Sequence, residues 1–423
     1  MTFRLAVAVF ALAPLTHFAS AATPDAPGGP VAADSAAAAP AAPAAPAKWS
    51  DTLKLGLQLE GGLTGNPSGP RDNLNYGHLF TDRANEPVLN QALITLGRPV
   101  DPKATDYDFG FKLQLLYGTD ARYTHLANMF DKFTRGRYQI DINEASVTAH
   151  TPWLTEGGVD LQAGIFPSPL GFETIDPSTN PFYSHSYIFN FGLPFKHTGA
   201  TAIVHATPML DVYAGVTSGA NTFVGSGDNN AAAALIAGLK LTFLDGNLTF
   251  LALSHIGPEN AKRAVPQANG AYRYYNDGII TWKATEKLTL TTELNYVRDD
   301  FARAEAFGIA QYAAYPITET VTLNGRAELF RDTRGFFVAA FPTAQGSVLA
   351  LEGFAVPTVS YGATTYGSLT LGATWKPAVP GFVENLLIRP EIRYDTVIDG
   401  GRRYNAGRDR NAVTLSADVV IAF

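Results

Sequence analysis

The sequence contains no cysteine, and only 16% of its 423 residues are charged. Without cysteine there can be no disulfide, thiol nucleophile or thiolate zinc site. The formal net charge of -7 leaves no cationic surplus of the kind that binds phosphates of nucleic acids, so we exclude nucleic acid as a partner. Beyond residue 21 there is no run of about 18 apolar residues, which excludes a membrane-spanning helix.

Recognisable catalytic motifs are also missing. The sequence has no HExxH, P-loop, GxSxG elbow or Rossmann glycine pattern after a strand-like segment. None of the eight histidines belongs to a helical metal pair, and Asp141, Asn143 and Glu144 lack the glycine and spacing of a calcium loop. Ser254 and His255 are adjacent, so they face opposite sides of a strand. We therefore expect no enzyme activity, catalytic residue, metal or cofactor.

The N-terminus has the features of an export signal in their usual order. Arg4 supplies a positive charge, residues 5–15 are apolar but too short to span a bilayer, and residues 19–21 form a small-residue cleavage site. Residues 1–21 are therefore predicted to be a signal peptide. Residues 22–48 are nearly all Ala, Pro, Gly and Ser, with too little apolar surface to drive folding. They are predicted to form a disordered periplasmic tether.

From residue 49 to residue 423 apolar and polar residues alternate. Leu55, Leu57 and Leu59, for example, alternate with Gln58 and Glu60. A period of two indicates a strand with one apolar and one polar face. The segments run for about 10 to 13 residues, longer than the strands of a typical sandwich and long enough for a tilted strand to cross a bilayer. The sixteen segments are 52–64, 88–98, 107–118, 138–150, 157–166, 196–207, 210–218, 233–243, 247–257, 271–284, 286–298, 308–316, 319–331, 365–376, 384–398 and 411–423.

These segments predict an all-β fold in which residues 49–423 form a closed antiparallel transmembrane β-barrel of 16 strands. Two further stretches, 336–341 and 347–354, could form an extra hairpin, so 18 strands is the alternative and the role of residues 332–364 stays open. Pro390 has no N–H to donate to a ladder. We therefore expect a bulge or a rim position at Pro390.

The connections between segments alternate in length. Long stretches such as 65–87 and 119–137 are each followed by short ones such as 99–106 and 151–156. Outer-membrane barrels have short periplasmic turns and long external loops. Both termini are therefore predicted to be periplasmic, and the barrel to lie in the outer membrane of a Gram-negative bacterium. All four tryptophans and the last residue then fall at the periplasmic rim as an aromatic belt. These residues are Trp49, Trp153, Trp282, Trp375 and Phe423.

The third long connection, residues 167–195, is rich in Gly, Pro, Asn and aromatic residues. Such a composition is typical of an irregular loop that packs on itself. A sixteen-stranded barrel has an aqueous lumen, where the rings are best buried against the inner wall. We therefore predict that this third loop folds inward and narrows the pore. An external lid or a contact within a homotrimer is the alternative.

Residues 157–205 resemble the central signature of the OmpL-like outer-membrane β-barrel porins. The residues that carry the resemblance are Gly171, Phe172, Glu173, Ile175, Asp176, Asn180, Tyr183, Ser184, His185, Ser186, Phe189, Pro194, His197, Thr198 and Gly199. The resemblance implies a passive outer-membrane porin. Phe423, which closes an alternating strand, resembles the C-terminal signature of bacterial outer-membrane proteins and implies insertion by the barrel-assembly machinery.

Fifteen charged side chains are predicted to face the lumen, eight of them acidic and seven basic. They are Lys54, Glu60, Asp108, Lys112, Asp160, Lys240, Lys283, Glu293, Arg326, Glu328, Arg389, Glu391, Arg393, Asp395 and Asp418. A near-balance of charge favours a general pore for small hydrophilic solutes or ions. A structural or adhesion barrel in the outer-membrane lipid is the alternative, and a hydrolase embedded in the barrel comes last.

The pore constriction is predicted where the third loop meets the wall. Glu173 and Asp176 on the loop are expected to face a basic strip that contains Arg389 and Arg393. His185 is expected to add a pH dependence near its usual pKa of about 6.5 if it faces the pore. The candidate constriction residues are Glu173, Asp176, His185, Lys196, Arg326, Arg389, Glu391 and Arg393.

Overall fold

The computed structural model describes residues 49–101, 104–130 and 135–423. The predicted signal peptide, 1–21, and tether, 22–48, lie outside the described residues. The strands are β1 (Lys54–Gly65), β2 (Pro87–Arg98), β3 (Asp108–Gly118), β4 (Gln139–Thr151), β5 (Val159–Pro167), β6 (Lys196–Thr207), β7 (Leu210–Thr217), β8 (Ala234–Phe243), β9 (Leu248–Pro258), β10 (Tyr272–Lys283), β11 (Thr289–Asp299), β12 (Ala304–Pro316), β13 (Val321–Asp332), β14 (Ala339–Ala340), β15 (Val359–Ser360), β16 (Thr364–Trp375), β17 (Asn385–Asp399) and β18 (Asn411–Ala422).

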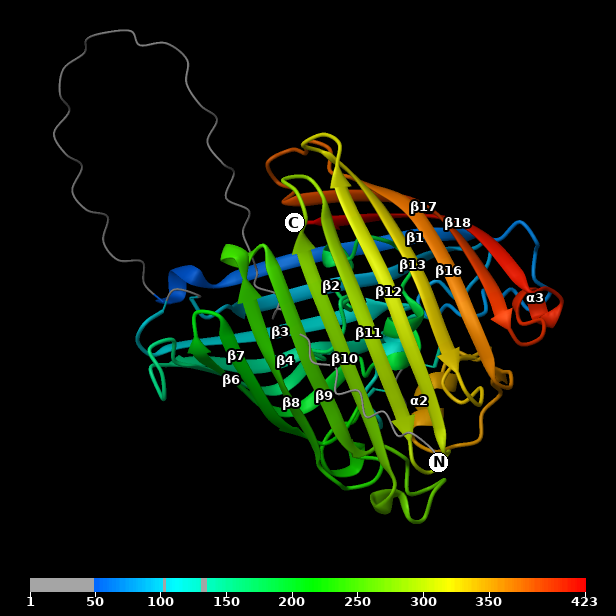
Figure 1. Cartoon of the computed structure of the whole chain (residues 1–423), viewed down its shortest axis with the longest axis horizontal. Coiled ribbons are helices and arrows are strands. Elements are labelled where there is room, and N and C mark those ends of the chain that lie inside the picture. Colours follow the sequence, from blue (N-terminus) through cyan, green and yellow to red (C-terminus); the bar gives the residue numbers. More distant parts are fainter. Residues whose placement is uncertain (1–48, 102–103, 131–134) are drawn as a thin grey trace, which may run out of the picture.

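Sixteen of these strands form one closed antiparallel barrel (Figure 1). Each strand pairs with its neighbours in the chain, and β1 pairs with β18 to close the sheet. The prediction of 16 strands is therefore confirmed. The alternative of 18 is wrong, because β14 and β15 contain two residues each and pair only with one another. They form a small hairpin within the loop that joins β13 to β16.

The alternation read from the sequence separates the two faces of the wall. On β18, the outward Val413, Leu415 and Val419 are 38%, 53% and 42% exposed, whereas the inward Asp418 is 1% exposed. An apolar outer face suits lipid, and a polar inner face suits water or other protein groups. β12 differs most from its predicted segment, since it begins at Ala304 and not at 308. Pairing of Ala304 with Asp299 on β11 extends the strand into a stretch of weak alternation.

Helices are short and lie in the connections. They are η1 (Trp49–Thr52), α1 (Ala121–Thr124), η2 (Pro177–Thr179), η3 (Ile188–Gly192), η4 (Gly225–Gly227), η5 (Leu244–Gly246), η6 (Ala268–Gly270), α2 (Gly346–Leu351) and α3 (Tyr404–Gly407). Among the residues that the structure describes, no helix has the length and apolarity needed to span a membrane.

The two ends of the barrel differ. One end carries both barrel termini and short turns, such as residues 208–209 between β6 and β7, and the other carries the long loops (Figure 1). By the rule for outer-membrane barrels, the short-turn end faces the periplasm. The four tryptophans lie at this end, before β1, after β4, and at the ends of β10 and β16, with 45–50% of each residue exposed.

Pro390 lies inside β17, and the expected bulge or rim position is wrong. Pro390 keeps Ala417 as its partner on β18. Toward β16 the ladder has no partner between Glu391 and Ile388, yet its register is unchanged across the gap. The missing N–H therefore interrupts one ladder locally, without the extra residue that a bulge inserts.

Candidate functional site

The third loop, residues 167–195, contacts inward-facing side chains of nine barrel strands. Its two ends meet at the wall, where Ser168 N donates to Phe195 O over 2.9 Å. Between them lie η2 and η3, the latter a single turn of π-helix. The wall strands that hold the loop by hydrogen bonds are β1, β2, β6, β10, β11, β12, β13, β16 and β17. The loop therefore crosses the lumen.

Acidic wall residues hold backbone N–H groups of the third loop. Each of the four carboxylates is at most 7% exposed, so its charge is compensated by protein donors and not by water. This arrangement uses the carboxylates as anchors. The pairs, with their N···O distances, are Gly171–Asp277 (3.1 Å), Phe172–Glu293 (3.0 Å), Tyr187–Glu328 (2.7 Å) and Tyr183–Glu391 (3.0 Å).

Three arginines of the wall hold loop carbonyl groups in the same way. Arg326, Arg389 and Arg393 are each at most 1% exposed. A buried guanidinium needs several acceptors, and the bent loop supplies carbonyls at several heights in the lumen. The carbonyl contacts are Arg326 to Ser184 O (2.7 Å), Arg389 to Pro177 O (2.6 Å) and Asn180 O (2.7 Å), and Arg393 to His185 O (2.6 Å).

The acidic residues of the loop do not face the basic strip expected from the sequence. Glu173 pairs with Arg326 at 2.6 Å, and Asp176 accepts from the Gln58 side chain at 2.9 Å. Arg389 instead pairs with Asp418, and Arg393 with Asp395. The reason is local: these wall arginines have carboxylates beside them on the same inner face, Asp418 across the ladder from Arg389 and Asp395 two residues after Arg393. That part of the prediction is wrong.

Lys196 and His185 also differ from expectation. Lys196 is the first residue of β6, fully buried, and its Nζ lies 2.6 Å from Asp141 Oδ2. His185 packs between Phe80 and Phe189, with ring centroids 4.9 and 4.3 Å away. Burial, together with the nearby Arg326, lowers the pKa of His185 to about 3. The imidazole is therefore neutral at physiological pH, and the condition for a pH dependence near 6.5, that His185 faces the pore, is not met in this structure.

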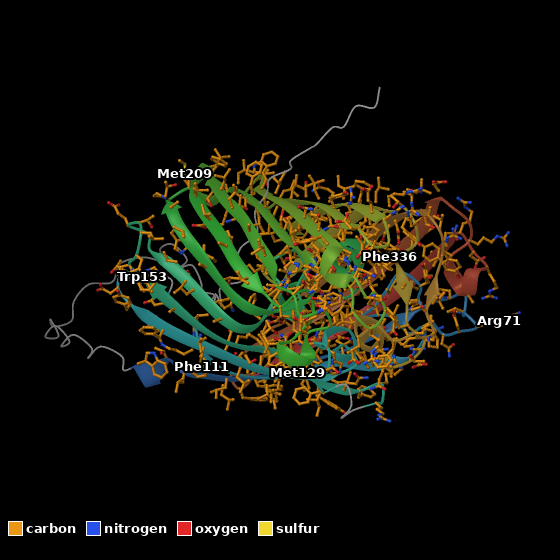
Figure 2. The ribbon with its side chains drawn as sticks, turned by 90° about the horizontal axis from the view of Figure 1, so that it is seen from below. Arg71, Phe111, Met129, Trp153, Met209 and Phe336 are labelled. Atoms are coloured by element: carbon orange, nitrogen blue, oxygen red, sulfur yellow. The ribbon has the colours of Figure 1, made fainter. Side chains whose placement is uncertain are left out.

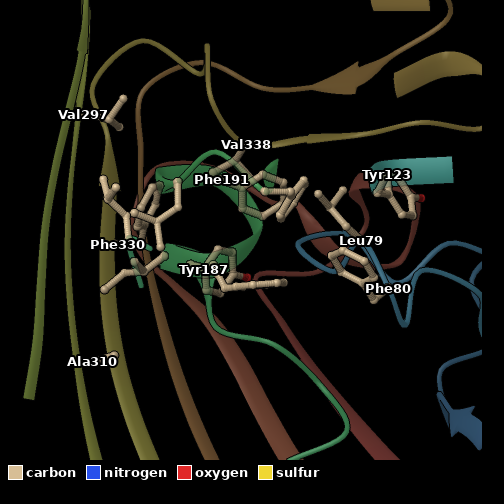
Figure 3. Close-up of a cluster of buried hydrophobic side chains, with 14 of the residues drawn as sticks. Leu79, Phe80, Tyr123, Tyr187, Phe191, Val297, Ala310, Phe330 and Val338 are labelled. Atoms are coloured by element: carbon tan, nitrogen blue, oxygen red, sulfur yellow. The ribbon is translucent and has the colours of Figure 1, made fainter. Parts of the chain in front are cut away.

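Aromatic side chains from other loops and from the inner wall pack against the third loop (Figure 3). Phe80, from the loop after β1, lies 5.6 Å from both Tyr123 and Phe189 between ring centroids. Tyr187 stacks on Tyr366 at 5.1 Å. The sequence analysis did not predict this aromatic packing, because the alternation of apolar and polar residues identifies strands and carries no information about loops. The density of aromatic residues in those loops was the available signal.

Around the whole circumference of the barrel, inward-facing side chains are buried by other protein groups. Each of the sixteen strands contributes at least one that is at most 7% exposed. The middle of the lumen is therefore filled by protein in this structure. One such residue per strand, from β1 to β18, is Glu60, Leu93, Gln114, Glu144, Phe166, Ile203, Tyr213, Ile236, Leu253, Ile279, Glu293, Tyr312, Arg326, Thr370, Arg389 and Asp418.

Nearer the periplasmic end, five charged or titratable side chains form a row across β4 to β8. We call His150, Asp160, His205, Asp211 and Lys240 the vestibule row. Successive N···O distances along it are 2.7, 3.1, 2.8 and 3.6 Å. Their side chains are 9–34% exposed, unlike the buried loop anchors. Sequence reasoning placed Asp160 and Lys240 in the lumen but did not connect them to the histidines.

The chemistry of these clusters is that of anchoring and solvation. Among the described residues, no group of three or more His, Asp or Glu side chains is arranged to hold a metal ion. Ser254 donates to Asn276 Oδ1 on the outer face, whereas His255 bonds to Thr217 on the inner face. That Ser–His pair therefore does not form a nucleophile and base.

Comparison with known proteins gives one family. The family model described as "Putative beta-barrel porin-2, OmpL-like" matches residues 52–423. Similar solved structures include Salmonella typhi OmpF in complex with daunomycin (TM-score 0.54, 10% identity, 88% of this chain and 97% of that chain covered) and the anion-selective porin of Comamonas acidovorans (0.52, 8%, 88% and 99%). Identities this low show the fold alone. A search of curated protein sequences finds no match.

Proposed function

Because the chain belongs to the OmpL-like β-barrel porin family and is an outer-membrane porin, we propose that small hydrophilic solutes or ions diffuse passively through it. The observation that supports this solute class is the near-balance of charge on the inner wall, together with a vestibule row that carries both signs. Neither sign dominates, so no single class of ion is strongly favoured. The protein lies in the outer membrane of a Gram-negative bacterium.

We further propose that the third loop is the constriction and that conduction requires it to shift. Glu173, Arg326, Arg389, Glu391 and Arg393 act as positioning residues, since each is buried against the loop or is part of it. The remaining candidates, Asp176, His185 and Lys196, support the loop and its end. With the loop in the observed position the middle of the lumen is packed, so the basal current should be small.

The partners are proposals as well. We propose insertion by the barrel-assembly machinery through Phe423, an aromatic belt of that residue and the four tryptophans in the outer-membrane lipid, and assembly as a homotrimer. We propose no enzymatic activity. A structural or adhesion barrel is the competing function, and the packed lumen is the observation that favours it.

Conductance decides between these functions. Purified protein in detergent should migrate in a heat-modifiable way, and in planar bilayers it should give discrete currents without esterase, lipase or protease activity. Reversal potentials in asymmetric salt should be close to zero if neither sign of ion is favoured. A folded barrel that stays silent, even after the third loop is removed, would instead support a structural role.

A further inference from the structure

The loop between β17 and β18, residues 400–410, carries an unusual concentration of positive charge. It contains four arginines and a single acidic residue, Asp409. The loop includes α3 and lies at the end of the barrel opposite the C-terminus (Figure 1). The exposed Arg71 of another external loop is at the same end (Figure 2). We call Arg402, Arg403, Arg408 and Arg410 the loop-8 arginines.

No carboxylate neutralises the loop-8 arginines. Among the described residues, none of the four has an acidic oxygen within 4.0 Å, and Asp409 accepts from the Asn405 side chain at 2.8 Å instead. Other arginines near this end do pair with carboxylates. These pairs are Arg122–Asp82, Arg137–Glu86, Arg273–Asp299, Arg298–Asp300 and Arg331–Asp399.

Two of these guanidinium groups lie beside Gly400. Arg410 Nη1 donates to Gly400 O at 2.8 Å, and Arg403 Nη2 lies 3.3 Å from the position that a Cβ on Gly400 would occupy. Arg403 is held there by Thr364 Oγ1 at 2.9 Å and by the ring of Tyr361, whose centroid is 4.8 Å from Cζ. Both guanidinium groups therefore lie beside Gly400, and their contacts there are to uncharged acceptors and a ring.

The cluster sits at the lipid-facing rim. Arg410 Nη2 donates to Val397 O at 3.1 Å, next to Ile398, which points outward and is 54% exposed. Below them the outer face of β17 and β18 is apolar, with Ile392 and Leu415 exposed. The head groups of the outer leaflet therefore meet the barrel at the height of this loop.

We propose that the loop-8 arginines bind a phosphate group of a phosphorylated glycolipid in the outer leaflet. Guanidinium groups match phosphate oxygens with paired hydrogen bonds, which a lysine could not do. Arg403 and Arg410 supply guanidinium donors beside Gly400, and the exposed Arg402 and Arg408 add attraction from the loop surface. The assignment rests on the outer-membrane orientation given above, but not on conduction.

The test uses the full chain, folded in detergent, and reads binding by native mass spectrometry. The probes are rough lipopolysaccharide, the same lipid after chemical dephosphorylation, and inorganic phosphate. One variant combines Arg403→Gln with Arg410→Gln, and a second combines Arg402→Gln with Arg408→Gln. In the second, the only bond removed is that from Arg408 Nε to Asn405 O, so folding is not at risk. The matched control, Lys262→Gln with Arg303→Gln, removes the same charge from exposed positions in other external loops.

We expect the phosphorylated lipid to bind about 10- to 30-fold more tightly than the dephosphorylated one, and both loop-8 variants to lose this preference while the control keeps it. Equal binding of the two lipids, or equal loss in the control, would overturn the proposal. Displacement of the lipid by millimolar inorganic phosphate would overturn the proposal that the bound phosphate group belongs to a lipid. It would show that the loop-8 arginines bind free anions. Because no current is measured, failure here leaves the porin function untouched, and silence in bilayers leaves this site untouched.

Discussion

The middle of the lumen and its periplasmic vestibule contain the same kinds of charged side chain and use them differently. In the middle, Arg326, Glu328 and Glu391 are at most 7% exposed and are bound to the third loop. In the vestibule row, Asp160 and His205 have side chains 34% and 31% exposed and bond only to one another and to neighbouring wall residues. A charge on the inner face of this barrel therefore holds the third loop where the loop reaches it, and stays partly exposed where the loop does not.

The largest effect should come from removing the loop that creates the difference. Replacing residues 169–194 by a short Gly–Ser turn is feasible, since Ser168 N and Phe195 O are already 2.9 Å apart. Single-channel conductance should rise several-fold, because the middle of the lumen would then resemble the vestibule. The control deletion removes residues 261–269 from the loop between β9 and β10. Equal conductance of the wild type and the loop variant, both folded, would contradict an internal loop.

Breaking one anchor should loosen the loop without removing it. Arg326→Met leaves Glu173 buried without its cation and Glu328 with only Arg393, 3.9 Å away. Removing one partner of a buried ion pair costs about 3–5 kcal/mol. We expect a lower unfolding midpoint in detergent and larger current fluctuations. Arg298→Met is the control, since that arginine is 49% exposed and its pairs should contribute about 0–1 kcal/mol. A similar decrease of the unfolding midpoint in both variants would show that the ion pairs at the third loop contribute no more to stability than an exposed ion pair.

An acidic group beside the external loops should make stability depend on pH. Burial raises the pKa of Glu259 from its usual 4.5 to about 7, although its bond from Ala220 N opposes the shift. The folded protein therefore binds this proton more tightly than the unfolded chain does. Its contribution is fully present below pH 4.5 and is lost as pH rises through 7, a change of about 3 kcal/mol.

The measurement for Glu259 is the unfolding midpoint at pH 5 and pH 8. Glu259→Gln should reduce the difference between the two values, whereas Glu305→Gln, at a side chain that is 38% exposed, should not. An unchanged pH difference in the Glu259 variant would refute the assignment.

Vestibule charges should alter selectivity more than total current. Asp160→Asn with Asp211→Asn leaves His150, His205 and Lys240 without acidic partners in the row. The reversal potential in asymmetric salt should shift toward anions, because these side chains are accessible to permeating ions. Asp300→Asn, at an external side chain with 31% exposure, is the control. A shift of the same size in the control would mean that charges at the external mouth, and not those of the vestibule row, set the ion selectivity.

The smallest effect is expected at His185. Burial and the nearby Arg326 lower its pKa to about 3, so the ring stays neutral between pH 5 and pH 8. His185→Gln should therefore leave the pH dependence of conductance unchanged over this range. A pH dependence present in the wild type and lost in the variant would mean that His185 reaches water when the pore conducts.

The alternation of apolar and polar residues along the sequence was enough to predict most of the strands. β6 was predicted at 196–207 and spans Lys196–Thr207, and the other strands differ from their segments by a few residues. Alternation reports which side of a strand meets lipid, and this depends only on residues two apart. The lengths of the connections predicted the orientation of the barrel in the membrane for the same reason, because the length of each connection follows from the sequence alone. The same alternation placed predicted lumen charges such as Arg326 and Asp160 on the inner face.

Tertiary structure decided which group of the third loop each lumen charge meets. Arg326 and Glu173 are 153 residues apart in sequence, and Tyr187 meets Tyr404 across 217 residues. Such contacts exist only once the barrel has closed and the loop has entered it, and several wall residues compete for each loop group. Pro390 makes the same point in the sheet, because its effect depends on whether its missing N–H would have faced β16 or β18. The sequence by itself determined the wall and its two faces, whereas long-range packing determined what fills the lumen.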